Sequence, residues 1–326
     1  MEIKCVWWNG YHNAFTDVIK FRNNFFITFR HALEHGVRGK GEIYVIKSND
    51  LEKWDLIKKF SIPPDCRDPK FFNFKNLIGV LFGVRSDKEN ESSKIDIYLS
   101  YSENGNDFEE PIKIKNYNLW FWRIRNFNDK LYATAYEMTS EYGTYLFLSE
   151  DGVNFKEVSH IVKGEYANEA DLLFEKDGLC YAIVRRENCQ TPVLAISQPP
   201  FKKWEKYPLN FIVQGPHIFK FFNTLYVAGR VFLKDEIILS EIKDRDYQTK
   251  TGIFELDLKN KKLDPMIIIA SGGDTSYPGS IVDNGKLYLS YYSQHELNLR
   301  ESKVGKNASG IYFLITGSLK KLKKEI

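Results

Sequence analysis

Short apolar segments recur in pairs along the whole chain, and a few polar turn residues divide the two segments of each pair. The segments are rich in Phe, Tyr, Ile, Val and Leu, a composition that favours strands over helices. Turn formers such as "NDK", "KDG" and "DNGK" stand between them and predict β-hairpins. The six pairs are "TDVIKF/FFITFR", "RDPKFFNF/LIGVLFGV", "WRIRNF/LYATAYE", "EADLLF/LCYAIVRR", "PHIFKF/LYVAGR" and "YPGSIV/LYLSYY".

A turn pattern repeats between these hairpins. It appears as "SNDLEKW" (48–54), "SENGNDF" (102–108) and "SEDGVNF" (149–155), with a looser fourth copy in "SQPPFKKW" (197–204). The closing aromatics stand at 54, 108, 155 and 204, so the interval is near 50 residues. Asp and Asn accept backbone N–H bonds in such turns, and Gly supplies a positive φ. A period of this length with short strands in every copy predicts a β-propeller.

The fold class expected is therefore all-β, with six four-stranded antiparallel blades in one domain over residues 1–326. The segment "IKCVWW" near the N-terminus is expected to supply the outer strand of the last blade and close the ring. A five-bladed propeller is the alternative if one pair is only a loop excursion.

Composition removes several classes of function. The chain has 46 basic and 43 acidic residues, a balance that gives no case for nucleic acid as a partner. No stretch approaches the run of about 18 apolar residues that a membrane span needs. The four cysteines show no metal-finger spacing, and the N-terminus does not read as a signal peptide. We expect a cytoplasmic protein without cofactor or metal; the composition leaves its oligomeric state open.

Polar residues are expected to converge where the first strands of the blades begin. Alignment of the six hairpins on their turns places one ionisable or polar residue from each blade in register: Asp17, Asp68, Arg123, Glu169, His217 and Tyr277. The ends of the second strands add Arg30, Phe82, Tyr136, Arg185, Arg230 and Tyr292. Burying so much charge is costly unless the groups are paired or used, so we interpret this ring as a functional funnel.

The motifs "RDPK", "NEADLLFEKDGLCYAIVRRE", "GPHIFKFFNTLYVAGR" and "SGGDTSYPGSIV" resemble those of bacterial sialidase-like (neuraminidase-like) six-bladed propellers. The resemblance covers most of the chain and implies a glycoside hydrolase acting on a terminal sugar. It implies that Tyr277 is the nucleophile, that Glu169 is its base, and that Arg185 and Arg230 bind the substrate's carboxylate. Arg186 is expected to point away, because neighbouring strand residues alternate faces.

Two differences from that family leave the sugar open. Thr16-Asp17-Val18 stands where the family has Arg-Ile-Pro, and a carboxylate there would repel an acidic ligand. The stretch "FRHALEHG" offers His31, Glu34 and His35 where the family has its acid/base aspartate. True sialidase activity is therefore not what these residues predict.

A second resemblance points to furanosidase-type propellers, whose three acids are similar in placement to Asp17, Asp68 and Glu169. In that scheme two carboxylates in one funnel push their pKa values apart and provide an acid and a base. The substrate-binding residues expected beside the catalytic ones are Arg30, His35, Arg67, Arg123, Arg185, His217, Arg230, Tyr292 and Trp122.

Other functions stay open beside hydrolysis. A non-catalytic carbohydrate-binding propeller and a protein-interaction scaffold both fit the fold, and so does a lyase acting on a uronate polymer with Tyr277 as acid or base. The spacing "HALEH" (31–35) does not match a zinc-protease motif, so no metal site is expected there.

Overall fold

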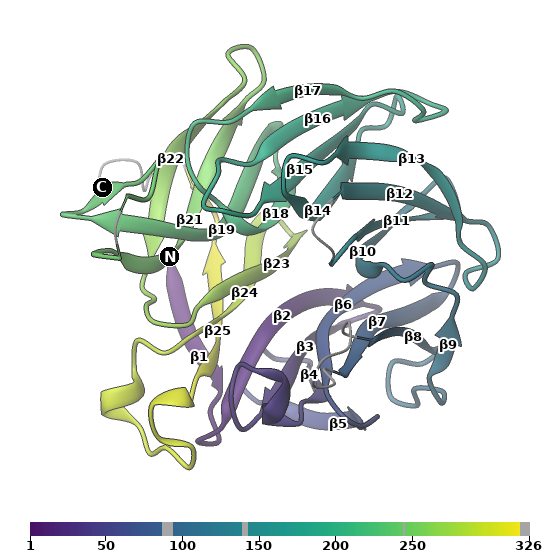
Figure 1. Cartoon of the computed structure of the whole chain (residues 1–326). Helices are drawn as coiled ribbons and strands as arrows, with labels where there is room; N and C mark the ends of the chain where they lie inside the picture. Colours follow the sequence, from purple (N-terminus) through teal and green to yellow (C-terminus); the bar gives the residue numbers. More distant parts are fainter. Residues whose placement is uncertain (87–93, 139–142, 244, 320–326) are drawn as a thin grey trace.

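The computed structural model describes residues 1–86, 94–138, 143–243 and 245–319. They form six antiparallel sheets arranged around a central channel, with the first strand of each sheet innermost (Figure 1). This confirms the six-bladed propeller predicted from the paired segments. Helix in the described residues is limited to three short 3₁₀ turns, η1 (Val37–Gly39), η2 (Leu297–Leu299) and η3 (Gly305–Asn307). No described helix is long and apolar enough to cross a membrane.

The first three blades follow the chain in simple order. Blade 1 contains β2 (His12–Phe21), β3 (Asn24–Ala32), β4 (Glu42–Ser48) and β5 (Asp55–Phe60). Blade 2 contains β6 (Cys66–Phe74), β7 (Leu77–Ser86), β8 (Lys94–Ser102) and β9 (Ile112–Ile114). Blade 3 contains β10 (Trp120–Phe127), β11 (Lys130–Tyr136), β12 (Gly143–Ser149) and β13 (Lys156–Lys163).

The last three blades complete the ring. Blade 4 contains β14 (Ala167–Phe174), β15 (Cys180–Arg186), β16 (Val193–Ser197) and β17 (Glu205–Pro208). Blade 5 contains β18 (Gln214–Phe221), β19 (Thr224–Lys234), β21 (Gln248–Asp257) and β22 (Lys262–Ile269), and the short β20 (Ile237–Ile238) pairs with β19. Blade 6 contains β23 (Ser276–Asp283), β24 (Lys286–Ser293) and β25 (Gly310–Thr316), with β1 (Glu2–Trp7) outside.

The N-terminal strand closes the ring as expected. β1 runs antiparallel to β25, with Glu2 opposite Ile315 and Cys5 opposite Tyr312. The two ends of the chain therefore share one sheet. This pairing supplies the outer strand of blade 6 and fixes blade 6 beside blade 1.

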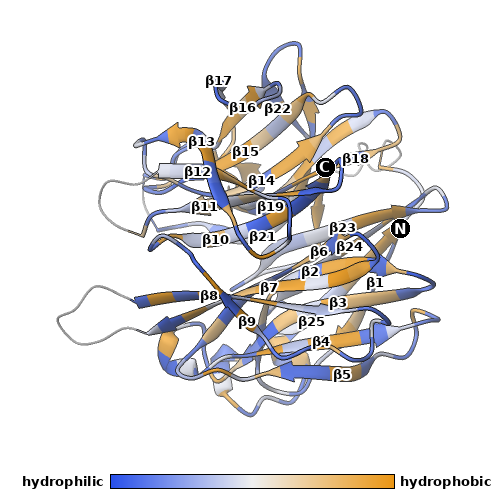
Figure 2. Ribbon diagram, turned by 90° about the vertical axis from the view of Figure 1, so that its right-hand side faces the viewer, coloured by the Kyte–Doolittle hydropathy of each residue, from blue (hydrophilic) through white to orange (hydrophobic). Residues whose placement is uncertain are grey.

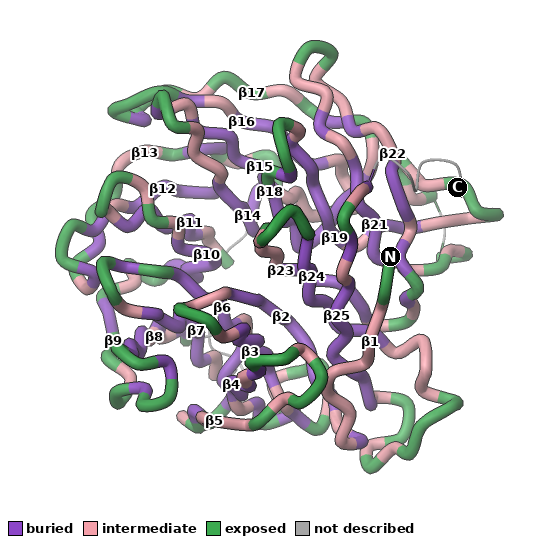
Figure 3. Tube along the Cα trace, turned by 180° about the vertical axis from the view of Figure 1, so that it is seen from behind, coloured by how far each residue is buried: buried purple, intermediate pink, exposed green. Residues whose placement is uncertain are grey.

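The apolar core lies between neighbouring sheets. Hydropathy colouring shows apolar residues along the strands and polar residues in the loops (Figure 2), and burial is concentrated on the inner strands (Figure 3). Aromatic rings bridge adjacent blades: Phe60 and Phe82 stack at 5.2 Å, and Tyr132 and Phe174 lie 5.0 Å apart. Such contacts pack neighbouring blades against one another and are one use of the 15% aromatic content.

Candidate active site

A cavity of about 370 Å³ opens at the end of the channel where the first strands begin. All six blades contribute to its lining. One lining residue from each, in blade order, is Phe15, Asp68, Trp120, Glu169, Arg230 and Tyr277. Side chains 262 positions apart in the sequence (15 to 277) thus meet around one space, as ring closure requires.

A β-bulge at the entry of every first strand decides which side chains reach this cavity. In blades 1, 2, 4, 5 and 6 the pairing with the second strand skips two residues, and in blade 3 it skips one. The skipped residues include Phe15, Asp68, Glu169 and Tyr277, all of which line the cavity. A bulge bends the strand and re-aims its side chains, so here it turns them into the funnel.

The predicted ring of six polar residues is wrong for three of its members. Asp17, Arg123 and His217 come after the bulge and pair directly with the second strand, so they lie deeper in the channel and do not line the cavity. Asp17 is buried; its Oδ1 lies 3.1 Å from Arg123 Nη1, and its Oδ2 accepts a bond from the Phe71 N–H at 2.9 Å. The three-acid scheme therefore loses Asp17.

His217 belongs to a buried network below the cavity. Its Nδ1 lies 2.7 Å from Asp171 Oδ2 and its Nε2 lies 2.7 Å from Ser280 Oγ, which is the order of a Ser-His-Asp triad. Burial, together with the charges of Arg123 and Arg125, lowers the pKa of His217 to about 4 despite the bond to Asp171. An imidazole with this pKa is a weak proton acceptor at neutral pH, so we assign the network to sealing the channel.

Glu169, Tyr277 and Arg185 form the centre of the cavity. The Tyr277 hydroxyl donates to Glu169 Oε1 at 2.9 Å, and Arg185 Nη1 lies 3.1 Å from the phenol oxygen and 2.8 Å from Glu169 Oε2. Glu169 is 5% exposed and Tyr277 7% exposed. Burial and the Glu169 carboxylate raise the pKa of Tyr277, while Arg185 and Arg230 oppose the rise. The resting site thus holds a neutral phenol on an acceptor that can take its proton.

Gly215 permits the close approach of blade 5 to this group. Its φ is +57°, and a Cβ there would lie 3.0 Å from the Tyr277 ring. Its N–H donates to Glu169 Oε2 at 3.1 Å. The glycine therefore fixes the carboxylate on one side and leaves room for the ring on the other.

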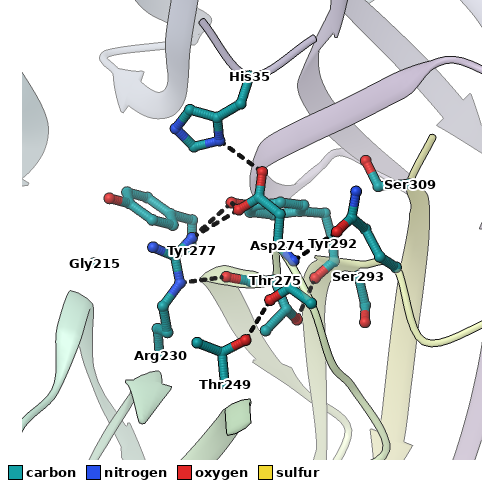
Figure 4. A network of polar contacts seen from close by, with 12 residues as sticks. His35, Gly215, Arg230, Thr249, Asp274, Thr275, Tyr277, Tyr292, Ser293 and Ser309 are labelled. Carbon is teal, nitrogen blue, oxygen red and sulfur yellow. Dashed lines mark hydrogen bonds and ion pairs between the residues drawn. The ribbon is translucent and has the colours of Figure 1, made fainter. Parts of the chain in front are cut away.

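A second polar group, centred on Asp274, borders the first (Figure 4). Arg230 Nη2 lies 3.0 Å from Asp274 Oδ1 and donates to the Tyr292 hydroxyl at 2.8 Å, while the guanidinium lies 5.2 Å from the centre of the Tyr277 ring. Tyr292 is fully buried and does not line the cavity. Tyr292 was predicted to bind substrate; the structure places it outside the cavity lining, where its hydroxyl holds Asp274 and Arg230.

Asp274 also accepts bonds from two histidines. Its Oδ2 lies 2.6 Å from His35 Nδ1 and 2.9 Å from His12 Nε2, and His35 lines the cavity. One potential metal-ligand atom from each of these three residues lies within 4.8 Å of the other two, as a metal site would require. Here they bond to each other, and Arg230 already occupies the other carboxylate oxygen. That no metal is needed stays a prediction.

Arg67 and Asp68, on β6, also line the cavity. Burial raises the pKa of Asp68, and the charge of Arg67 opposes it. Arg67 Nη2 donates to the His35 carbonyl at 3.0 Å. Arg30, by contrast, is 0% exposed and bonds to Asp65 Oδ1 at 2.6 Å. Arg30 was predicted to bind substrate; the structure places it behind the residues that line the cavity.

Trp122 supports the site from behind. Its ring is buried, 5.6 Å from the Tyr277 ring, with Lys70 Nζ 5.1 Å from its centre. Trp122 was expected among the substrate-binding residues, but it is Trp120 that lines the cavity. Arg186 points away as expected, donating to the Thr191 carbonyl.

Several lining residues were not anticipated. They include Phe15, Arg85, Glu137, Asn168 and Glu187. Glu187 follows Arg185 by two positions, and it bonds to Arg185 Nη2 at 3.1 Å. Residues two positions apart on a strand share a face, so the spacing of Arg185 and Glu187 could have predicted that both face the cavity. For Asp274, three residues before Tyr277 in "GGDTSY", the signal was a carboxylate in the loop entering the last inner strand.

Comparison with known proteins identifies the fold and nothing finer. No family model and no curated sequence matches the chain. Among solved structures, Trypanosoma rangeli sialidase matches with a TM-score of 0.67 and 12% identity, covering 96% of this chain and 56% of that one. A Bombyx mori GH32 β-fructofuranosidase matches at 0.51 and 14%, covering 94% and 61%. A Bacillus halodurans xylan β-1,4-xylosidase matches at 0.52 and 15%, covering 79% and 55%.

The chain spans little more than half the length of the sialidase and of the xylosidase. The identities are low, so the likeness establishes a propeller architecture shared with glycoside hydrolases. The chemistry has to be argued from the site itself.

Proposed function

We propose that the protein is a glycoside hydrolase that removes a terminal acidic sugar, with Tyr277 as nucleophile and Glu169 as its base. The observation that carries the proposal is the 2.9 Å bond from the Tyr277 hydroxyl to Glu169 Oε1, beside the Arg185 guanidinium. A tyrosine paired with a glutamate in a propeller funnel is the known alternative to a carboxylate nucleophile in this class of enzymes.

The pair divides the chemistry between two side chains. Because the pKa of Tyr277 is raised, the phenol keeps its proton until attack begins, and Glu169 Oε1 takes that proton as the phenol oxygen bonds to the anomeric carbon. Arg185 Nη1, 3.1 Å from the phenol oxygen, stabilises the negative charge that develops there. Hydrolysis of the resulting aryl-linked sugar would regenerate both groups.

The cavity lining carries four arginines beside four carboxylates, and the arginines are what support an acidic substrate. Arg67, Arg185 and Arg230 all line the cavity, and arginine forks bind carboxylates with two parallel bonds. A neutral phenol also meets less repulsion than a carboxylate when the anomeric carbon bears an acid group. Asp17, which would have repelled such a ligand, is outside the cavity, and blade 1 presents the apolar Phe15 instead. We infer an exo-acting enzyme, because the buried network closes the channel below the cavity.

A panel of 4-methylumbelliferyl glycosides tests this function. Sialic acid and its deaminated analogue KDN represent acidic sugars, and arabinofuranose and xylose represent neutral ones. We expect turnover of an acidic member, a loss of about 10²–10⁴-fold in kcat for Glu169→Gln, and at least as large a loss for Tyr277→Phe. Tyr207→Phe, on outer strand β17, is the matched control and should retain wild-type rates. Full activity in Tyr277→Phe would contradict the proposal.

A second candidate is carbohydrate binding without turnover. The observation that favours it is that the loop after β3 brings His35 to the cavity and no carboxylic acid. The same panel separates the two candidates. Tight sugar binding without product, equal in wild type and Glu169→Gln, would support a binding protein.

A further inference from the structure

Cleavage of a glycosidic bond needs an acid for the leaving oxygen, and Glu169 is already engaged as the base of Tyr277. We propose that His35, held by Asp274, is the general acid that protonates the leaving group and then the base that activates water. This assignment rests on the glycosidase function proposed above.

The position of His35 fits this role. Its side chain is 52% exposed and lines the cavity. Its ring lies 5.1 Å from the Phe15 ring, which in turn lies 5.2 Å from the Tyr277 ring, so the imidazole stands one aromatic ring away from the nucleophile. Nδ1 is engaged by Asp274 Oδ2 at 2.6 Å. That bond leaves Nε2 as the nitrogen that can exchange a proton with substrate.

The loop that carries His35 is held by backbone contacts on both sides. Arg30 donates to the carbonyls of Glu34 at 2.7 Å and Gly36 at 2.9 Å, and Arg67 donates to the carbonyl of His35 itself at 3.0 Å. Three successive carbonyls are thus fixed by two guanidinium groups. The buried Arg30 therefore positions the loop from behind the residues that line the cavity.

Asp274 is the ionised partner that such an acid needs. Burial alone would raise its pKa, but the hydrogen bonds from His12 and His35 and the charge of Arg230 hold that pKa well below its usual range. A carboxylate on Nδ1 orients the imidazole ring and stabilises its protonated form. The arrangement is the Asp–His pairing of hydrolases, used here for acid catalysis.

The charged groups facing His35 come from four elements. Asp274, in the loop before β23, favours the imidazolium. Arg67 on β6, Arg230 on β19 and His12 on β2 stand around the same carboxylate or the same loop and oppose it when charged. The ring is therefore placed between one anion in direct contact and cations that lie further from its nitrogens.

The proposed reaction balances over two steps. In the first, the Tyr277 oxygen bonds to the anomeric carbon as its proton moves to Glu169. The bond to the leaving oxygen breaks, and that oxygen keeps the electron pair and takes the proton from His35 Nε2. In the second, His35 Nε2 takes a proton from water, the hydroxide oxygen bonds to the anomeric carbon, and the Tyr277 oxygen departs and recovers its proton from Glu169.

Leaving-group dependence tests the assignment. The probes are the methyl and the 4-nitrophenyl glycosides of sialic acid, because methoxide needs protonation to leave and nitrophenolate does not. We expect His35→Ala to lose about 10²–10⁴-fold in kcat/KM on the methyl glycoside and to form the tyrosyl intermediate from the nitrophenyl glycoside at close to the wild-type rate. Asp274→Asn should reduce the methyl-to-nitrophenyl ratio in the same direction and shift the alkaline limb of the pH–rate profile, which is the limb that a general acid controls.

Controls distinguish the ways in which the idea can fail. His31→Gln, on the same strand–loop unit but stacked on Tyr44 and outside the cavity lining, should keep the wild-type ratio. An unchanged methyl-to-nitrophenyl ratio in His35→Ala would overturn the role of His35. Loss of wild-type activity in the presence of a chelator, with recovery on addition of zinc, would overturn it as well. Absence of wild-type turnover on the nitrophenyl glycoside and on every acidic member of the panel would instead count against the glycosidase function.

Discussion

An unusual backbone conformation marks several of the residues that line the cavity. Phe15, Asp68 and Tyr277 have φ values of 61°, 54° and 50°, in the left-handed region that residues with a Cβ seldom adopt. All three lie inside β-bulges and line the cavity. Local strain of this kind persists where the surroundings over-determine it, and here it aims side chains into the funnel.

Residues after the bulges carry a pH-dependent contribution to stability. The pKa of His217 is about 4 in the folded protein, against an ordinary value of 6.5. Between those values the unfolded chain binds a proton that the folded protein does not, so the free energy of unfolding should fall as the pH drops from about 6.5 to about 4. Urea unfolding across this window checks the sign. His217→Gln should show a weaker pH dependence than wild type, and an identical slope would contradict the assignment.

Which residues reach the cavity was only partly predictable from the sequence. Eight predicted residues line it: His35, Arg67, Asp68, Tyr136, Glu169, Arg185, Arg230 and Tyr277. Seven lie outside its lining: Asp17, Arg30, Phe82, Arg123, His217, Tyr292 and Trp122. Counting along a strand assumes a fixed alternation, and a bulge changes that count without a sequence signature of its own. The hairpins were therefore predictable from the sequence. Whether each polar residue lies within the bulge or after it was not.

At the scale of elements, the repeated turns form the side-chain to backbone hydrogen bonds that their composition predicted. Asp50, Asn104 and Asp151 each accept two backbone N–H bonds from the residues two and three positions later. These bonds fix the connection between the third and fourth strands of a blade, and they depend on local chemistry alone. That is why the repeat was visible in the sequence.

The inner strand β23 packs closely against β2 at Gly279, a contact that could not be predicted from the sequence. Gly279 follows its bulge, and a Cβ there would overlap the Asp17 carboxylate and lie 2.8 Å from the Val18 nitrogen. Gly279→Ala should separate Asp17 from Arg123 and lower the free energy of unfolding by about 1–3 kcal/mol, as overpacking does. Gly317→Ala, where nothing lies within 4 Å of the added carbon, is the matched control. Equal urea midpoints for the two variants would contradict this account of the channel.

At the scale of the whole molecule, ring closure creates the site. β1 joins β25, which fixes blade 6 beside blade 1, and the ring brings Tyr277 of β23 to Glu169 of β14, 108 residues earlier. The fold class, the blade number and the closing strand all followed from the repeat. The meeting of His35 with Asp274, 239 residues apart, did not, because both lie in loops with no periodic pattern.

Covalent trapping tests the central claim most directly. Trypanosoma rangeli sialidase has been captured with 2,3-difluorosialic acid as a covalent intermediate. The same reagent and its KDN analogue can be incubated with this protein, and the modified peptide identified by mass spectrometry. The account predicts one sugar adduct on Tyr277, absent in Tyr277→Phe. An adduct on Asp68 or Glu169, or turnover of an acidic glycoside with Tyr277 never modified, would contradict it.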